Sequence, residues 1–413
     1  MGNTRLVRSL MASALGAGLF FAGAQLAFGQ PVKVEFPAKP DSAELPEVWP
    51  EEAGVNSDQL IKLSQWIRDQ KLDVRSLVVV KDGKIAFERY SSGLTRDKNY
   101  ELYSITKALT GILAGELIAE GKISLDSSVK DVVGAFRPDL KDAVADKEKV
   151  KLRNVLGMTT GLYYDFKPPN DPIYYEAPDR LKLAATTKPL LEPGKVFQYM
   201  DVNPIFATAM LSAAAGQKLE NYAEEKVFKP LGMKHYAWSR ADERGLVSGG
   251  WGLRLRPVDM ARLGLFALQN GQWEGKQVTP AGWIKQMTTG QSTPFFGYYW
   301  WVNNILEGGV EGGEQPEFDT MGFKGQNIVV LPKYNAVVTM TSIMSPDGGL
   351  RDAKCLQILR YMMSEYILPS LNQKPSSPTD AQKKALIDEL QLAEDSKGVP
   401  GFALDPNNTD MPQ

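Results

Sequence analysis

The stretch SITKALTGILAGELIAE, residues 104–120, is the most decisive part of this 413-residue sequence. Its apolar residues recur at positions 105, 109, 112, 113 and 117, the spacing that places side chains on one face of a helix. Gly121 follows directly, at a position where glycine commonly ends a helix. The pattern predicts a buried helix with Ser104 at its N-terminal end.

Ser104 and Lys107 stand three residues apart and therefore share one face of this predicted helix. Lysine has an ordinary pKa of ~10.4 and is a poor base at neutral pH, but burial lowers that pKa. A buried Lys107 could then accept the proton of the Ser104 hydroxyl and make the serine a nucleophile. The alternative is a plain helix cap beside a surface lysine. A second Ser-x-x-Lys match, at 127–130, follows Asp126 in a polar stretch where its lysine is expected to be solvated.

The segments on both sides of this helix predict an α+β fold. Upstream, Asn56 can cap a helix, and an Asp-Gly turn joins two strands within residues 76–87. Downstream, three strand signals and a helix occur at 298–302, 328–331, 336–340 and 350–366. This order predicts an antiparallel sheet built from both chain ends and flanked by helices, with an inserted, mainly helical region. The expected divisions are a linker or arm over 30–50, an α/β region over 51–103 and 246–370, a mainly helical region over 104–245, and a C-terminal tail over 371–413.

Composition and charge exclude several classes of protein. Hydrophobic residues make up 43% and charged residues 23%, typical globular values, so a disordered or collagen-like chain is excluded. The 47 Lys and Arg against 49 Asp and Glu give a net charge of −2, which does not indicate a nucleic-acid partner. The single Cys, Cys355, excludes an intramolecular disulfide, and the single His, His235, excludes a zinc site of several histidines. We expect Cys355 to be a core thiol and His235 to be a surface or structural residue.

The N-terminus is typical of an export signal. Arg5 and Arg8 precede a segment without charge up to Lys33, and small residues lead to a cleavage position after Gly29. The apolar run is shorter than the ~20 residues of a membrane span. We therefore expect a signal peptide over residues 1–29, no stable membrane span after its cleavage, and a periplasmic or secreted protein.

A series of short motifs follows the Ser-x-x-Lys match along the chain. They are VLGMTTGL at 155–162, EPGKVFQY at 192–199, PLGM at 230–233, RPVDMARLG at 256–264 and MGFKGQ at 321–326. Between about residues 50 and 365 the sequence resembles the serine hydrolases related to class C β-lactamases and DD-peptidases. It looks like the branch with family VIII esterases and 6-aminohexanoate-dimer hydrolase. The resemblance implies a β-lactamase/DD-peptidase-like fold and chemistry without a metal or organic cofactor.

The resemblance also implies roles for individual residues. Ser104 would be the acylated nucleophile and Lys107 its base or proton relay. Tyr199 matches the tyrosine of the family's Tyr-x-Asn motif and would shuttle the proton to the leaving group. The backbone N–H groups of Ser104 and of Phe323, which follows Gly322, would form the oxyanion hole. An ordinary core tyrosine is the alternative for Tyr199.

Two positions depart from the family pattern. Asp201 stands where the Tyr-x-Asn motif has Asn, and an anion there would raise the pKa of Lys107 and work against a base role. Thr320 stands where β-lactamases carry the Lys of Lys-Thr-Gly, which helps to hold the substrate carboxylate, so efficient β-lactam turnover is not expected. A shifted register that uses Lys324 is the alternative.

The leading hypothesis is an exported serine hydrolase that cleaves a small-molecule ester or amide through a Ser104 acyl-enzyme. Asp201 and the loop aromatics Tyr164 and Trp251 are candidates for substrate binding, although each aromatic could equally be plain packing. One alternative is a β-lactamase or D-alanyl-D-alanine carboxypeptidase. The other is a catalytically inactive penicillin- or peptide-binding protein of the same fold.

Overall fold

The computed structural model describes residues 44–91, 93–167, 171–174, 177–238, 241–303, 305, 317–344 and 350–397. The predicted signal peptide and residues 30–43 of the predicted arm lie outside these described residues. Among the helices that the described residues form, none has both the length and the apolar character needed to cross a membrane.

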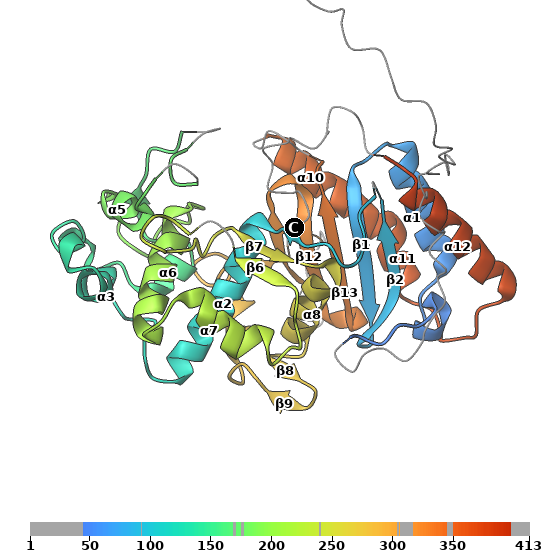
Figure 1. Cartoon of the computed structure of the whole chain (residues 1–413), viewed down its shortest axis with the longest axis horizontal. Coiled ribbons are helices and arrows are strands. Elements are labelled where there is room, and N and C mark those ends of the chain that lie inside the picture. The colour runs from blue at the N-terminus through green and yellow to red at the C-terminus, as the bar shows by residue number, and fades with distance from the viewer. Residues whose placement is uncertain are drawn as a thin grey trace, which may run out of the picture. The chain divides into compact units, whose positions relative to one another are not determined.

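The centre of the fold is a six-stranded antiparallel sheet. Its strands are β1 (Val74–Lys81), β2 (Lys84–Tyr90), β10 (Trp301–Val302), β11 (Phe318–Gly322), β12 (Gln326–Leu331) and β13 (Ala336–Ser342). They lie in the order β10-β11-β12-β13-β1-β2. Figure 1 labels the last four strands of this order, β12, β13, β1 and β2. Because β1 pairs with β13, the N-terminal hairpin and the C-terminal strands form one sheet. The predicted α+β fold, with its sheet built from both chain ends, is confirmed.

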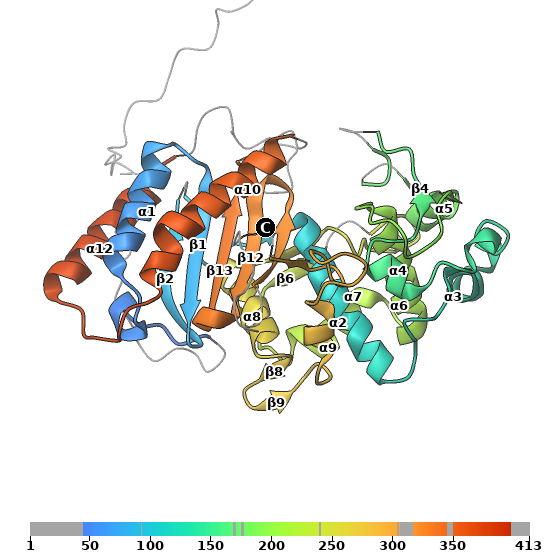
Figure 2. The ribbon, with the colours of Figure 1, turned by 180° about the vertical axis from the view of Figure 1, so that it is seen from behind.

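Helices cover both faces of this sheet, which explains why its strands are apolar on both sides. Alternate residues of β1 enter two separate cores: Val78 and Val80 face one, Leu77 and Val79 the other. The first core contains α8 (Pro257–Leu268). The second contains α1 (Ser57–Asp69), α10 (Leu350–Met362) and α12 (Asp380–Glu394), which Figure 2 shows on the same side of the sheet.

The first and last of these helices are joined through side chains. Asn56 caps α1, as predicted, by accepting the backbone N–H of Asp58 at 2.9 Å. Glu389 of α12 accepts hydrogen bonds from Ser64 at 2.7 Å and from Arg68 at 2.9 and 2.8 Å, both on α1. The described part of the predicted C-terminal tail is therefore packed on the fold.

A mainly helical block lies between the two parts of the sheet in the sequence. Its helices are α2 (Thr106–Ala119), α3 (Val129–Phe136), α4 (Leu152–Leu156), α5 (Arg180–Ala185), α6 (Val202–Ala215) and α7 (Leu219–Ala223). Short strands lie before, within and after this block. They are β3 (Tyr100–Glu101), β4 (Leu162–Tyr163), β5 (Lys188–Pro189), β6 (Tyr236–Trp238), β7 (Leu253–Leu255), β8 (Gln272–Trp273) and β9 (Lys276–Gln277). The short helix α9 (Trp283–Met287) and α6 both pack on α2, which is buried over most of its length.

The strand predicted over 298–302 is wrong in extent, because only Trp301–Val302 pair as β10. Tyr299 has a φ of +67°, which breaks an extended path. Just before it, a methyl group on Gly297 would lie 2.0 Å from the carbonyl oxygen of Met287, so the chain turns tightly against α9. Apolar residues here fill the core without forming a strand.

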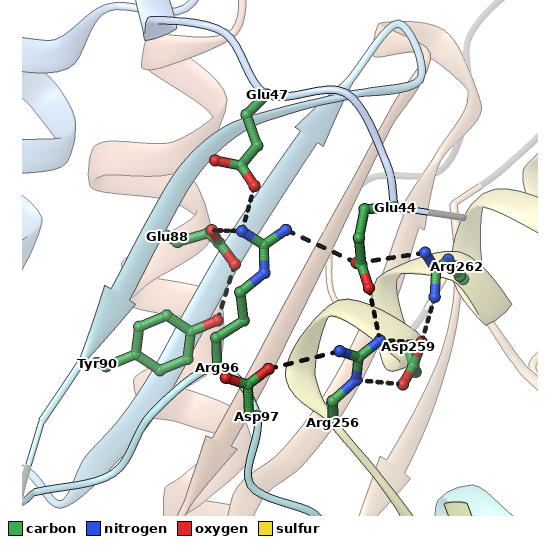
Figure 3. Close-up of polar contacts among 9 residues, drawn as sticks. All are labelled: Glu44, Glu47, Glu88, Tyr90, Arg96, Asp97, Arg256, Asp259 and Arg262. Atoms are coloured by element: carbon green, nitrogen blue, oxygen red, sulfur yellow. Dashed lines mark hydrogen bonds and ion pairs between the residues drawn. The ribbon is translucent and has the colours of Figure 1, made fainter. Parts of the chain in front are cut away.

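The described end of the predicted arm is bound to the sheet, as Figure 3 shows. Glu44 forms ion pairs with Arg256, the N-cap residue of α8, at 3.2 Å and with Arg262, in the middle of that helix, at 3.3 Å. Arg96 pairs with Glu47 of the same arm and, at 3.2 Å, with Glu88 of β2. Burial alone would raise the pKa of Glu44, but the two arginines on α8 hold it below its usual value.

Candidate active site

Ser104 lies in a tight turn that leads into α2. Residues Tyr103–Ile105 form a single 3-10 turn, and α2 begins at Thr106, one residue after position 105, where the predicted apolar pattern begins. Tyr103 has a φ of +48°, an uncommon conformation for a bulky residue, and it presents Ser104 at the end of the helix. Lys107 follows in the first turn of α2, and its Nζ lies 2.9 Å from Ser104 Oγ. The predicted contact between the two side chains is therefore present.

Lys107 is almost completely buried, with 2% of its side chain exposed. Its Nζ donates to the carbonyl oxygen of Gly250 at 3.1 Å and lies 2.7 Å from Asp201 Oδ1. The Tyr199 side chain also lies beside it, with 4.9 Å between Lys107 Nζ and the ring centroid. Burial alone lowers the pKa of Lys107, but Asp201 and Tyr199 outweigh it and raise that pKa above its ordinary value. The expectation of a lowered pKa is thus wrong, and the effect predicted for an anion at position 201 is present.

Asp201 stands directly before α6 and has partners for both carboxylate oxygens. Its Oδ2 accepts a hydrogen bond from the Tyr174 hydroxyl at 2.6 Å, and its Oδ1 faces Lys107. Burial and the Asp201 charge together raise the pKa of Tyr174. Asn203, two residues further on, is fully buried and accepts a hydrogen bond from Thr160 at 2.9 Å, so it does not take the place of the missing Asn.

Tyr199 is 39% exposed, which excludes the core-tyrosine alternative. Its ring stacks on Trp301 with 5.9 Å between centroids and 16° between planes. Lys107 Nζ lies 4.9 Å from the Tyr199 ring centroid. Trp301 in turn packs against Phe296, with ring centroids 4.8 Å apart, and against Phe197, at 6.0 Å. Sequence reasoning missed this aromatic support because it treated residues 298–302 only as a strand.

The end of β11 lies against the turn that carries Ser104. A methyl group on Gly322 would lie 2.2 Å from the carbonyl oxygen of Leu102, and the Phe323 ring meets Tyr103 edge-on at 5.4 Å. The predicted oxyanion-hole residues are therefore on neighbouring backbone segments. Thr320 is 2% exposed and points into the fold.

Lys324, the alternative source of the positive charge that β-lactamases carry before Thr-Gly, lies beside Tyr103 and Phe323. It is mostly buried, with a φ of +68°. Its Nζ lies 5.6 Å from the Tyr103 ring centroid and 5.5 Å from that of Phe323, so the ammonium group makes cation–π contacts with both rings.

The remaining candidate residues have partners within the protein. The Tyr164 hydroxyl donates to Asp171 at 2.5 Å. Trp251 is 5% exposed and its ring faces the Arg180 guanidinium at 4.7 Å, behind Tyr174. These contacts favour packing roles for both aromatics.

The structure also places three other residues that the sequence singled out. His235 is exposed and Cys355 is buried. Lys130 of the second Ser-x-x-Lys match pairs with Glu148 on the surface at 2.9 Å, so it is solvated as predicted. Among the described residues, no three His, Cys, Asp or Glu side chains form a group that could hold a metal ion.

A family model described as "Beta-lactamase" matches residues 64–354 of this chain. The chain belongs to the β-lactamase family. The family identifies it as a serine hydrolase, and the resemblance stated from the motifs is confirmed.

Curated relatives of this β-lactamase-family protein match part of its sequence. A protein of Escherichia coli strain K12, provisionally named a D-alanyl-D-alanine carboxypeptidase, is 25% identical over 216 residues, 46% of this chain and 50% of that protein. A Salmonella agona protein with the same name is 27% identical over 215 residues. The chain thus spans about half the length of the curated relatives it matches.

Solved structures share the fold at low sequence identity. A Bacillus anthracis protein, provisionally named 6-aminohexanoate-dimer hydrolase, has a TM-score of 0.61 at 18% identity, covering 80% of this chain and 88% of that one. A family VIII carboxylesterase has a TM-score of 0.56 at 16% identity, covering 76% and 98%. At these identities the likeness establishes the fold alone.

Proposed function

We propose that this chain is an exported serine hydrolase that cleaves a small-molecule ester or amide through an acyl-enzyme on Ser104. The observation that carries the proposal is the 2.9 Å contact between Lys107 Nζ and Ser104 Oγ. A positive charge at this distance stabilises the alkoxide that forms when serine loses its proton. The predicted signal peptide supports a periplasmic or secreted location.

The reaction has two stages. In the first, Ser104 Oγ attacks the substrate carbonyl carbon, and its proton passes through the Lys107–Tyr199 pair to the leaving group. The backbone N–H groups of Ser104 and Phe323 would hold the oxyanion that forms, because Gly322 brings β11 against the Ser104 turn. In the second stage, water attacks the acyl-enzyme and the same groups return the proton to Ser104.

One observation favours a second candidate, a D-alanyl-D-alanine carboxypeptidase or β-lactamase. The curated relatives carry the carboxypeptidase name. Such an enzyme must hold a substrate carboxylate, and Thr320 supplies no positive charge at the position where β-lactamases have a lysine. An ester or amide substrate is therefore the stronger proposal. The experiment below also tests the alternative, a D-alanyl-D-alanine peptide or a β-lactam.

The test is the mass of the intact mature protein after exposure to a fluorophosphonate and, separately, to a penicillin, followed by peptide mapping. An adduct on Ser104 with the fluorophosphonate alone is the expected result. A stable penicilloyl adduct would favour the cell-wall enzymes. A folded protein with no adduct from either reagent would overturn the enzyme reading and favour an inactive binding protein.

Two variants make this test specific. Ser104→Ala should abolish the adduct and the hydrolysis of phenyl butyrate. Ser127→Ala removes the serine of the second Ser-x-x-Lys match and should change neither. Hydrolysis that survives in Ser104→Ala would refute the mechanism.

A further inference from the structure

Asp201 is the residue at which this site departs most from the family pattern, and the fold has enclosed it. The side chain is 15% exposed, and both of its oxygens are engaged by protein groups, Oδ1 by Lys107 at 2.7 Å and Oδ2 by Tyr174 at 2.6 Å. A methyl group on Gly250 would lie 3.1 Å from Oδ1, so the backbone closes the pair from a third side. Because both carboxylate oxygens contact protein groups, Asp201 is not in a position to bind the substrate.

We propose that Asp201 and Tyr174 are positioning residues that keep Lys107 as a permanent ammonium, so that Lys107 acts as a cation beside Ser104 rather than as its base. The inference rests on the proposed function and assigns the proton-accepting step within it to Tyr199. It replaces the expectation that Asp201 binds substrate.

The hydrogen-bond partners of Lys107 match this assignment. An ammonium has three N–H donors and no acceptor. Lys107 Nζ donates to Ser104 Oγ at 2.9 Å and to the Gly250 carbonyl oxygen at 3.1 Å, forms an ion pair with Asp201 Oδ1 at 2.7 Å and also interacts with the Tyr199 side chain. Removing the proton from Lys107 would leave the Asp201 carboxylate without its counter-charge in a largely buried place, which is costly.

Among the described residues around the pair there is one further cation, Arg180, which donates to the backbone carbonyl of Tyr174 at 3.2 Å and faces the Trp251 ring. Tyr199 faces Lys107 from the segment before α6, and Tyr174 faces Asp201 from the loop before α5. Tyr299 is buried, and burial is the main cause that raises its pKa, with a further contribution from Asp201. The three tyrosines bring no positive charge and Arg180 contacts the backbone of Tyr174, so the cation that lies directly against Asp201 is Lys107, at 2.7 Å.

The proton transfers then balance without a change at Lys107. As the bond from Ser104 Oγ to the carbonyl carbon forms, the hydroxyl proton moves to the Tyr199 oxygen. The proton that Tyr199 already carries moves to the leaving oxygen or nitrogen, whose bond to carbon breaks. The products are the acyl-enzyme and the protonated leaving group, and Lys107 keeps its three protons while it stabilises the charge on Oγ.

The experiment is the pH profile of kcat/KM for phenyl butyrate, from pH 5 to 10, in the wild type and in Asp201→Asn. Without the carboxylate, burial is left to lower the pKa of Lys107, so a required ammonium is lost at a lower pH. The expected result is an alkaline limb displaced toward neutral pH by about one unit or more, with a lower rate at pH 8. If Lys107 were a neutral base, the variant would instead gain activity on the acid side, and that result would overturn the inference.

Three variants complete the design. Asp201→Glu keeps the charge and should keep the alkaline limb of the wild type. Tyr174→Phe keeps the charge but releases one oxygen, so kcat should fall about tenfold, the worth of one charged hydrogen bond. An unchanged kcat would remove Tyr174 from the assignment. Tyr90→Phe is the control, because it deletes a tyrosine-to-carboxylate hydrogen bond of 2.8 Å to Glu88, outside the site, and should leave the profile unchanged.

The remaining outcomes separate this inference from the proposed function. If Asp201→Asn does not fold, the activity of Lys107→Arg tests the cation role instead, because arginine cannot lose its proton. Activity above that of Ser104→Ala supports the cation role, and activity at that background overturns it. Wild-type hydrolysis that does not depend on Ser104 overturns the proposed function and this inference together. Ser104-dependent hydrolysis with an acid-side gain in Asp201→Asn overturns the inference alone.

Discussion

Gly322 and Leu102 are in backbone contact: a methyl group on the glycine would lie 2.2 Å from the leucine carbonyl oxygen. Leu102 belongs to the segment that leads into the Ser104 turn, and Gly322 ends β11. The two halves of the site come from opposite ends of the chain, and this contact fixes the distance between them. A side chain at position 322 would push β11 away from Ser104.

Gly322→Ala should therefore lower kcat far more than it lowers stability. Displacement of one oxyanion donor costs ~2.7–4 kcal/mol of transition-state stabilisation, or about 10²- to 10³-fold in kcat. The measurement is kcat for phenyl butyrate beside the thermal unfolding midpoint. Gly134→Ala is the matched control, since a methyl group there would meet its nearest neighbour at 3.8 Å. Wild-type kcat in Gly322→Ala would place the oxyanion donor elsewhere.

Replacing Lys107 with Met should destabilise the fold, and a second change should restore it. Lys107→Met leaves the Asp201 carboxylate buried without a counter-charge, which costs about 3–5 kcal/mol. The double variant Lys107→Met with Asp201→Asn removes that charge and should recover most of the loss without recovering activity. Urea unfolding of both variants measures the difference. A double variant no more stable than the single one would contradict the ion pair seen at 2.7 Å.

The sequence predicted the local part of this site well because its spacing is local. Ser104 and Lys107 share a helix turn, and the structure places them in contact. Tyr174 and Asp201 are 27 residues apart, with α5, β5 and irregular chain between them, and no helical or strand period predicts that path. The sequence indicated two opposing effects on the pKa of Lys107, burial and the charge of Asp201. Their balance depends on distances that only the fold sets, and the structure shows that the raising effect is the larger one.

The fold was predictable in outline because hairpins and amphipathic helices leave regular patterns. The paired strands β12 and β13 follow the predicted segments closely, since their apolar residues lie in continuous runs. The segment at 298–302 has an equally apolar run but turns at Tyr299. An apolar run alone does not distinguish a strand from buried irregular chain.

The carboxyl group of Glu88, next to Arg96 in Figure 3, should make stability depend on pH. Burial raises its pKa from 4.5 to about 7, against the opposing charge of Arg96. Between these values the folded protein holds a proton that the unfolded chain has lost, so stability falls as the pH rises. The loss reaches about 3 kcal/mol at ~1.36 kcal/mol for each pKa unit.

Glu88→Gln removes this titration. Its unfolding midpoint relative to the wild type should therefore rise between pH 5 and pH 8, as measured by thermal unfolding at several pH values. Glu274→Gln, at an exposed position, should show no such trend. A constant difference between Glu88→Gln and the wild type would mean that Glu88 is ionised throughout this range.

Trp301 should act on catalysis through Tyr199, on which it stacks at 5.9 Å. An aromatic pair contributes about 0.5–1.5 kcal/mol, so Trp301→Ala should lower kcat about three- to tenfold by loosening the tyrosine that moves the proton. Trp301→Phe keeps an aromatic face and should restore most of that loss. Steady-state kinetics with phenyl butyrate separate the two effects: a kcat loss at constant KM fits support of Tyr199. A raised KM at constant kcat would show instead that Trp301 contacts the substrate and leaves Tyr199 in place.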